Sequence, residues 1–273
     1  MAYELTQSFG EKQLCRNEST NNLIFIHGGI IANANLPLIT KSDILIHNYN
    51  ILHYHRRGYG LSSHIDTDIT INDQAKDCKE LLDYLKIQKA HILGHSIGGS
   101  IAIEFAYMYK SYVKSLILLE PAITGYNQYS NFNVINAFDT MIVKYDKGYR
   151  EDVMINFMNL AIGKDFKRII ENVLPSNSFN MSVIDADIFF HNEINAMKSW
   201  IFTERHARNL SDIPILHIFG KQKDRPISQE RDKLLLKMLP NIKSCSIQEA
   251  PHMLQITNYH EVSEIISSFI SKI

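Results

Sequence analysis

The feature that most constrains the fold is an alternation along the chain between short apolar runs and amphipathic segments of helix length. Six branched, apolar runs predict buried strands at residues 23–26, 51–54, 90–93, 116–119, 215–219 and 244–247. Amphipathic stretches predict helices at residues 72–85, 97–109, 229–239 and 260–270. Such alternation is typical of crossover units, and near-continuous apolar strands indicate a sheet covered on both faces. The pattern therefore predicts an α/β fold with a mostly parallel central sheet flanked by helices. Two weaker segments, residues 2–9 and 13–16, predict an antiparallel hairpin at the sheet edge.

The alternation is interrupted by residues 125–210, which have helical periodicity and no convincing strand. This stretch is under a third of the chain, yet it contains five of the nine Met and eight of the 13 Phe residues. We predict that residues 1–124 and 211–273 form the core, and that residues 125–210 form an inserted helical cap of the same folding unit. Most of the Met and Phe side chains should form the cap's own core, and a minority should line an apolar space between cap and sheet.

Composition excludes several classes of protein. With 28 Lys+Arg against 29 Asp+Glu, the net charge of −1 gives no basic excess for a nucleic-acid partner. Three dispersed cysteines fit neither a disulfide framework nor a Cys-x-x-Cys metal site, and His47, His53 and His55 lack a third ligand at convincing spacing. No run of residues is long and apolar enough for a membrane span, and no signal peptide is visible. We therefore expect a soluble, cytoplasmic protein without a metal site.

The most informative local sequence is Gly94-His95-Ser96-Ile97-Gly98, which lies directly after a predicted strand and directly before a predicted helix. A tight strand-to-helix turn exposes a serine at the carboxyl edge of the sheet, in a strained backbone conformation. Small residues are needed two positions before and after it, because the turn brings their Cα atoms against neighbouring backbone. The helix that begins at Ile97 also directs free N–H groups at developing negative charge. The turn predicts that Ser96 is a nucleophile.

The sequence resembles the α/β-hydrolase fold family over nearly its whole length. The resemblance rests on five segments in the family's order, namely His27-Gly28-Gly29, Arg56-Arg57-Gly58-Tyr59-Gly60-Leu61-Ser62, the Gly94–Gly98 pentapeptide, the strand and loop from Pro214 to Asp224, and Ala250-Pro251-His252. Relatives often have Asp two residues before the Arg-Gly turn, where this chain has His55. That departure bears on local hydrogen bonding and not on catalysis.

The resemblance implies a triad of Ser96, Asp224 and His252, the nucleophile–acid–base order that this fold uses. His252 would take the proton of Ser96, and Asp224 would accept a hydrogen bond from the far nitrogen of the His252 ring. The acid has a rival in Glu120, which ends a predicted strand at a position where some members of the fold carry their acid. Asp224 is preferred for its spacing of four residues from Gly220.

The resemblance also implies an oxyanion hole made of two backbone N–H groups. Ile97, the residue after the nucleophile, would supply one group, and Gly29, or alternatively Ile30, the other. His27 and His95 are expected to hydrogen-bond loop backbone and not to act as bases.

A serine nucleophile with an oxyanion hole suits acyl transfer, whereas dehalogenases and epoxide hydrolases of this fold need a carboxylate nucleophile. We predict a serine hydrolase that uses no cofactor and acts on a small molecule, cleaving a carboxylic ester of a small or medium apolar acyl substrate through the triad and an acyl-enzyme. Alternatives on the same triad are a C–C bond hydrolase, a lactonase, a thioesterase and an acyltransferase. A further alternative is a ligand-binding sensor that retains the pocket. In the cap, four polar or amphipathic residues are expected to be structural more often than substrate-contacting: His191, Glu193, Trp200 and His206. The sequence does not indicate an oligomeric state.

Overall fold

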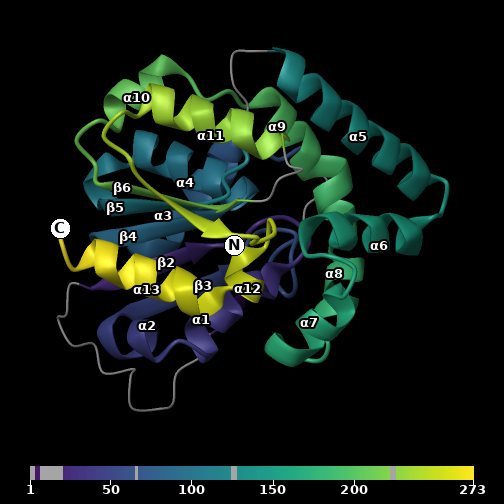
Figure 1. Cartoon of the computed structure of the whole chain (residues 1–273), viewed down its shortest axis with the longest axis horizontal. Helices are drawn as coiled ribbons and strands as arrows, with labels where there is room; N and C mark the ends of the chain where they lie inside the picture. The colour runs from purple at the N-terminus through teal and green to yellow at the C-terminus, as the bar shows by residue number, and fades with distance from the viewer. Residues whose placement is uncertain (1–3, 7–20, 65–66, 124–127, 222–225) are drawn as a thin grey trace.

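A computed structural model describes residues 4–6, 21–64, 67–123, 128–221 and 226–273. Its centre is a seven-stranded sheet in the order β1-β3-β2-β4-β5-β6-β7, with β1 antiparallel to β3 and every other neighbouring pair parallel (Figure 1). The strands are β1 (Glu4–Thr6), β2 (Asn22–Ile26), β3 (Asn50–His55), β4 (Ala90–His95), β5 (Val113–Leu119), β6 (Ile215–Lys221) and β7 (Lys243–Gln248). The six strands predicted from the apolar runs are confirmed, as is the α/β fold class.

The predicted amino-terminal hairpin is confirmed only in part. A strand, β1, does form inside residues 2–9, and it runs antiparallel at the sheet edge. Its partner is β3, with Leu5 opposite Tyr54. Residues 13–16, the other half of the predicted hairpin, lie outside the described residues.

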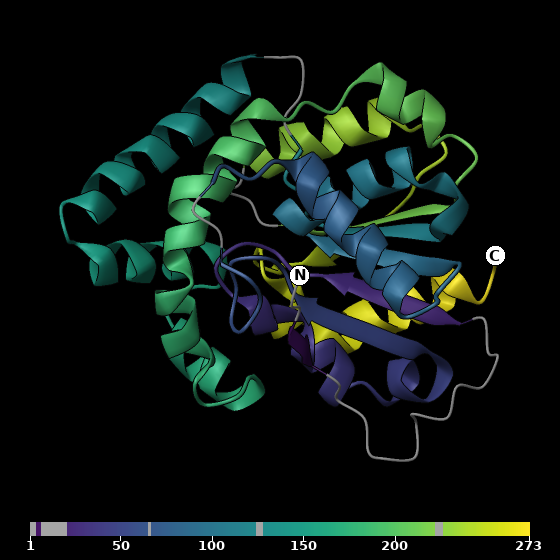
Figure 2. The same ribbon diagram turned by 180° about the vertical axis from the view of Figure 1, so that it is seen from behind.

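Side chains of β2 to β6 alternate between two helical layers. In β2, Leu23 and Phe25 pack into one hydrophobic cluster and Ile24 and Ile26 into the other, all of them fully buried. The first cluster lies under α1 (Leu36–Thr40), α2 (Asp43–Asn48), α12 (Leu254–Thr257) and α13 (Tyr259–Ile270). The second lies under α3 (Ile71–Tyr84), α4 (Ile97–Met108) and α11 (Pro226–Met238) (Figures 1 and 2). Two short 3₁₀ helices, η1 (Ala32–Asn35) and η2 (Lys110–Tyr112), complete these layers. Each buried aliphatic side chain stabilises the fold by about 1.5–3 kcal/mol.

The described part of residues 125–210 is helical and contains no strand. It comprises α5 (Gln128–Asp146), α6 (Arg150–Ala161), α7 (Phe166–Val173), α8 (Ser178–Ile184), the π-helical turn η3 (Ile188–Glu193), α9 (Ile194–Ser199) and α10 (Glu204–Asn209). We call these elements the insertion, because they connect β5 to β6. Helices α5 to α8 lie beyond one end of the sheet, whereas α10 lies over the sheet and packs on α4 (Figures 1 and 2).

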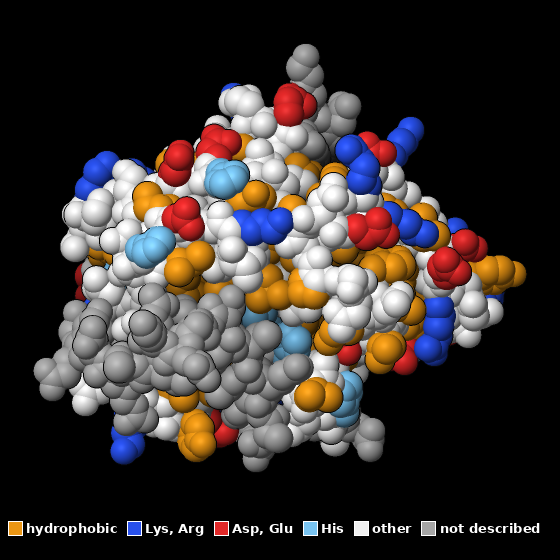
Figure 3. Space-filling model, turned by 90° about the horizontal axis from the view of Figure 1, so that it is seen from below, with side chains coloured by type: hydrophobic (Ala, Val, Ile, Leu, Met, Phe, Trp, Pro, Cys, Tyr) orange, Lys and Arg blue, Asp and Glu red, His pale blue; other side chains and the backbone are white. Residues whose placement is uncertain are grey.

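The apolar side chains of the insertion divide into a buried and an exposed set. Several of the Met and Phe residues noted in the sequence are buried in the same cluster as core residues of β5 and α12, namely Met154, Met158, Phe166, Phe189 and Phe190. Other large side chains face outward: Val143, Tyr149, Leu160 and Ile184. On the insertion's side of the molecule (right in Figure 3), hydrophobic side chains lie among charged ones. No described helix combines the length and the apolar character that crossing a membrane requires.

Candidate active site

Ser96 lies in a strained turn between β4 and α4. Its φ of 52° and ψ of −122° are unusual for a residue with a side chain. Such a conformation persists only where the surroundings hold it in place. Here the Ser96 N–H donates to the Leu119 carbonyl at 3.0 Å, and the Ser96 carbonyl accepts from the N–H groups of Gly99 and Ala122, each at 2.8 Å. The Ser96 side chain is half-buried.

The glycines around Ser96 are required by close packing of backbone. A Cβ atom on Gly98 would stand 2.5 Å from the His27 carbonyl oxygen and closer still to that of Ile26, at the end of β2. A Cβ atom on Gly94 would collide with the backbone of Gly98. The reason predicted for the Gly-x-Ser-x-Gly spacing is thus confirmed.

A buried carboxylate, Glu120, contacts the imidazole of His252. Glu120 follows β5 directly and is fully buried, and its Oε1 accepts the Gly220 N–H at 2.7 Å. Its Oε2 lies 2.7 Å from Arg231 Nη2 and 3.2 Å from His252 Nδ1. A carboxylate only accepts hydrogen bonds, so this contact places a proton on Nδ1 and leaves Nε2 as the basic nitrogen.

Ser96, Glu120 and His252 therefore share one edge of the sheet. The Ser96 N–H bonds to Leu119, the residue before Glu120, and Glu120 in turn contacts the His252 ring. Parallel strands place their carboxyl ends at the same edge, which is where ligands bind in open α/β sheets. Asp224, the predicted acid, lies outside the described residues, so its role remains a prediction.

His95 supports the loop of His252 and does not compete with it as a base. Its Nε2–H donates to the backbone carbonyl of His252 at 3.0 Å, and the two rings are 4.9 Å apart. Burial, with the neighbouring His252 as a second cause, lowers the pKa of His95 to about 3. His95 is therefore neutral near pH 7, which confirms its predicted structural role.

The loop after β2 holds a second neutral histidine. The backbone N–H of Arg56 donates to His27 Nε2 at 3.0 Å, so the ring proton is on Nδ1, which donates to the Gly28 carbonyl at 2.7 Å. Burial, followed by the positive charge of Arg56, holds the pKa of His27 well below its usual value. The expectation that His27 bonds loop backbone is confirmed.

The loop after β2 also distinguishes between Gly29 and Ile30, the two alternatives predicted for the second oxyanion donor. The Ile30 N–H is already engaged, because it donates to Tyr59 Oη at 3.2 Å. Ile30 itself has a φ of 68°, and the Ile31 N–H closes a tight turn around it onto the Gly29 carbonyl at 2.8 Å. Gly29 is therefore the better candidate. Ile97 lies in the first turn of α4, where N–H groups have no acceptor within the helix.

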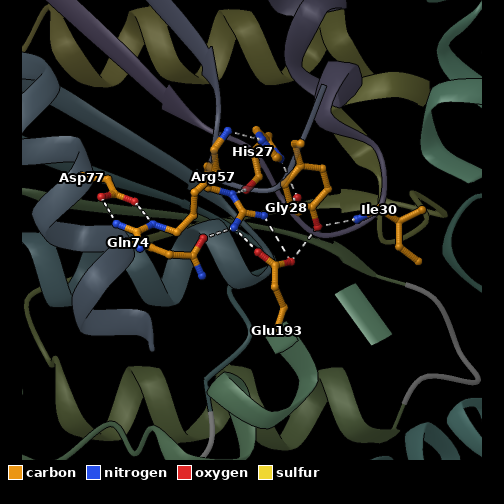
Figure 4. Close-up of polar contacts among 9 residues, drawn as sticks. His27, Gly28, Ile30, Arg57, Gln74, Asp77 and Glu193 are labelled. Carbon is orange, nitrogen blue, oxygen red and sulfur yellow. Dashed lines mark hydrogen bonds and ion pairs between the residues drawn. The ribbon is translucent and has the colours of Figure 1, made fainter. Parts of the chain in front are cut away.

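A buried ionic network links this loop to the insertion. Arg56, at 2% exposure, donates from Nε to the His27 carbonyl at 3.1 Å and from Nη2 to the Gly28 carbonyl at 2.9 Å. Its guanidinium also pairs with Glu193, at 0% exposure, through Nη1 and through Nη2 at 3.3 Å. Tyr59 Oη donates to Glu193 Oε2 at 2.7 Å (Figure 4).

Protonation states in the network follow from these contacts. Burial is the largest influence and by itself would lower the pKa of Arg56, but Glu193, Tyr59 and Tyr54 together outweigh it and the pKa is raised. Burial, followed by the Glu193 charge, raises the pKa of Tyr59 well above its usual value. Sequence reasoning gave neither Arg56 nor Tyr59 a role. The one available signal was Glu193, the only Asp, Glu, Lys or Arg residue within residues 188–197, because a carboxylate there must find a partner if it is buried.

The remaining singled-out residues have structural contacts. Trp200 Nε1 and His206 Nε2 contact Glu104 Oε2 at 2.8 and 3.0 Å, and exposed His191 contacts Asp146 at 2.8 Å. His55 Nε2 contacts Asn33 Oδ1 at 2.9 Å. Within the described parts of the chain, no group of three or more His, Cys, Asp or Glu side chains could hold a metal ion.

Comparisons with known proteins agree with the α/β fold described above. A relative in Haemophilus influenzae, provisionally named as an esterase/lipase, is 24% identical over 95% of this chain and 86% of its own length. A carboxylesterase structure from Nitrososphaera gargenis has a TM-score of 0.76 at 18% identity, covering 99% of this chain and 93% of the other. The enol-lactonase of Burkholderia xenovorans LB400 has a TM-score of 0.75 at 16% identity, covering 99% and 96%. At these identities the structural likeness establishes the fold alone. The family model described as "alpha/beta hydrolase fold" matches residues 21–259, and the chain therefore belongs to the α/β-hydrolase fold family.

Proposed function

We propose that this protein is a serine hydrolase that cleaves carboxylic esters through an acyl-enzyme, with Ser96 as nucleophile and His252 as general base. The observation that carries the proposal is the contact between His252 Nδ1 and the buried Glu120 carboxylate, beside the strained turn of Ser96. That contact leaves His252 Nε2 basic at the edge where the Ser96 hydroxyl lies. Glu120 is the acid that the described contacts favour, and Asp224 is the alternative that the sequence favours.

In the proposed reaction, His252 Nε2 takes the hydroxyl proton as Ser96 Oγ attacks the ester carbonyl. The oxyanion that forms accepts hydrogen bonds from the N–H groups of Gly29 and Ile97. Protonated His252 then gives its proton to the leaving alcohol as the C–O bond breaks. Water, deprotonated by the same nitrogen, then attacks the acyl carbonyl; His252 returns the proton to Ser96 Oγ as the bond between that oxygen and the acyl carbon breaks, and the acid is released.

We infer that the insertion acts as a cap that covers an apolar acyl group. Phe189 packs directly on Gly29. The centres of the Phe138 and Phe157 rings lie 6.0 and 5.5 Å from the centre of the Phe189 ring. Aromatic side chains next to an oxyanion donor favour an apolar acyl chain over a charged one. The likeness to an enol-lactonase makes lactone opening the second candidate, since a lactone is an internal ester and needs the same residues.

The test compares the wild-type protein with Ser96→Ala on p-nitrophenyl esters of increasing chain length, on lactones, and with a fluorophosphonate probe. Ser111→Ala is the matched control, because Ser111 is exposed and lies at the opposite end of β5. We expect labelling and turnover in the wild type and in Ser111→Ala, and neither in Ser96→Ala. Wild-type protein that never labels would refute the proposal, and ligand-induced stabilisation without turnover would favour a sensor.

A further inference from the structure

We propose that Glu193, which the insertion supplies, is a positioning residue for the oxyanion hole. It acts through Arg56 and Tyr59 on the peptide group between Gly28 and Gly29 (Figure 4). This inference rests on the proposed function and adds to it a residue that touches neither the substrate nor the triad.

The peptide group between Gly28 and Gly29 is held from its carbonyl side. The Gly28 oxygen accepts from Arg56 Nη2 at 2.9 Å and from His27 Nδ1 at 2.7 Å. A trans peptide is planar, with its C=O and N–H bonds pointing in opposite directions. Two donors on the Gly28 oxygen therefore fix the direction of the Gly29 N–H, the proposed oxyanion donor. Rotation of this peptide would break both hydrogen bonds in a buried environment.

Arg56 can hold this position only because Glu193 compensates its charge. Its guanidinium is buried, and Glu193 is the carboxylate that pairs with it, alongside the neutral amide of Gln74. The same carboxylate accepts from Tyr59 Oη, which itself accepts the Ile30 N–H. Glu193 thereby constrains the residues on both sides of Gly29. An unpaired buried guanidinium would shift toward water or draw in another group, and the Gly28 oxygen would lose one donor.

The segment that carries Glu193 also packs on Gly29, in the loop after β2, and on Gly58, in the turn after β3 that carries Arg56 and Tyr59. A Cβ atom on Gly29 would collide with the ring of Phe189, and one on Gly58 would stand 2.5 Å from Ile188 Cγ1. Phe189, Ile188 and Glu193 all belong to η3, the described element in which the backbone adopts a π-helical turn. Such turns are frequent at functional sites. The π-helical turn thus places Phe189 against the loop after β2, and Ile188 and Glu193 against the turn after β3.

The test compares Glu193→Gln with Glu104→Gln. Glu104 is also a buried carboxylate with side-chain partners, which are Asn72, Trp200 and His206, but it has no described contact with the oxyanion loop. We expect kcat of Glu193→Gln to fall by about 100-fold with KM within about twofold, the effect of a misplaced catalytic group. Its affinity for a boronic acid, which adds to Ser96 as a tetrahedral anion, should fall by a similar factor. Glu104→Gln should keep wild-type kcat and boronate affinity even where its thermal midpoint falls.

Tyr59→Phe provides the second variant. It removes the hydroxyl that joins Glu193 to the Ile30 N–H, but it leaves the ion pair between Arg56 and Glu193 intact. We expect an intermediate loss of kcat and of boronate affinity, and this result carries the test if Glu193→Gln does not fold. Thermal midpoints that fall while both variants keep wild-type kcat and boronate affinity would overturn the inference and leave the proposed function standing. Wild-type protein that neither turns over esters nor labels at Ser96 would instead overturn both.

Discussion

Replacement of Glu120 with glutamine tests which acid orients His252, and the structure sets the size of the expected effect. Among the described residues, Glu120 accepts from the Gly220 N–H, Arg231 Nη2 and His252 Nδ1. Glutamine has one acceptor oxygen and one NH₂ group. If the oxygen keeps the Gly220 N–H, the NH₂ group faces both Arg231 and His252, so His252 loses Glu120 as an acceptor and, with it, the contact that favours a proton on Nδ1.

Two losses follow from that geometry. Loss of the tautomer should lower kcat by about 10⁴-fold, the effect of the corresponding amide substitution in a serine-protease triad. That factor equals about 5 kcal/mol of activation free energy. The free energy of unfolding should also fall, by about 3–5 kcal/mol, because the Arg231 side chain is only 14% exposed and is left without its carboxylate.

The assay measures kcat on a p-nitrophenyl ester, at a temperature where urea unfolding shows every variant to be folded. The kcat of Asp224→Asn is measured alongside that of Glu120→Gln, because Asp224 is the acid that the sequence favours. Arg231→Met is the control for stability, since it disrupts the ion pair but leaves Glu120 for His252, and its kcat should stay within about tenfold of wild type. If Glu120→Gln keeps more than a tenth of wild-type kcat while Asp224→Asn loses about 10⁴-fold, then Glu120 is a structural partner of Arg231 and the reasoning is wrong.

Two further predictions concern stability. Burial lowers the pKa of His53 and of His95 to about 3, so as the pH falls below 6.5 the unfolded chain binds protons that the folded chain does not. The free energy of unfolding should therefore drop by about 2 kcal/mol for each histidine between pH 7 and pH 5 in urea titrations, and equal values at the two pH values would contradict this. Gly98→Ala should lower the free energy of unfolding by about 3 kcal/mol or more, because the added Cβ atom meets the Ile26 and His27 carbonyls. Gly148 has a φ of +90° but open space around it, so Gly148→Ala should lower the free energy of unfolding by only about 1 kcal/mol. Equal thermal midpoints for the two variants would refute the packing argument.

The strands and the turn of Ser96 could be predicted from the sequence, because each depends on residues close together in the chain. The apolar runs define β2 to β7, and the Gly-x-Ser-x-Gly spacing between a strand and a helix identifies the turn of Ser96. The left-handed φ of Ser96 and the contact of Gly98 with the end of β2 both follow from that turn. Motif order along the chain extends the prediction to the loops of His27 and His252, since a parallel sheet gathers its carboxyl ends at one edge.

Pairings across long sequence separations could not be predicted in the same way. Arg56 and Glu193 are 137 residues apart, and their contact depends on how the insertion docks on the core. The choice between Glu120 and Asp224 is of the same kind, because each acidic residue follows a strand and only the packing of side chains decides which one reaches His252. Periodicity indicates which face of an element is buried, but not which of several buried partners a polar atom meets.

The buried pair also determines how the insertion can move. If η3 separated from the core, Arg56 would remain in a buried position without its carboxylate, at a cost of about 3–5 kcal/mol, before the loss of the Phe189 and Ile188 contacts is counted. An opening with that cost is populated in roughly one molecule in a hundred or fewer. At this contact the insertion is therefore not an independent lid. It moves with the loop of His27, Gly28 and Gly29, so a substrate that reaches Ser96 by opening of the insertion must enter where other parts of the insertion meet the core.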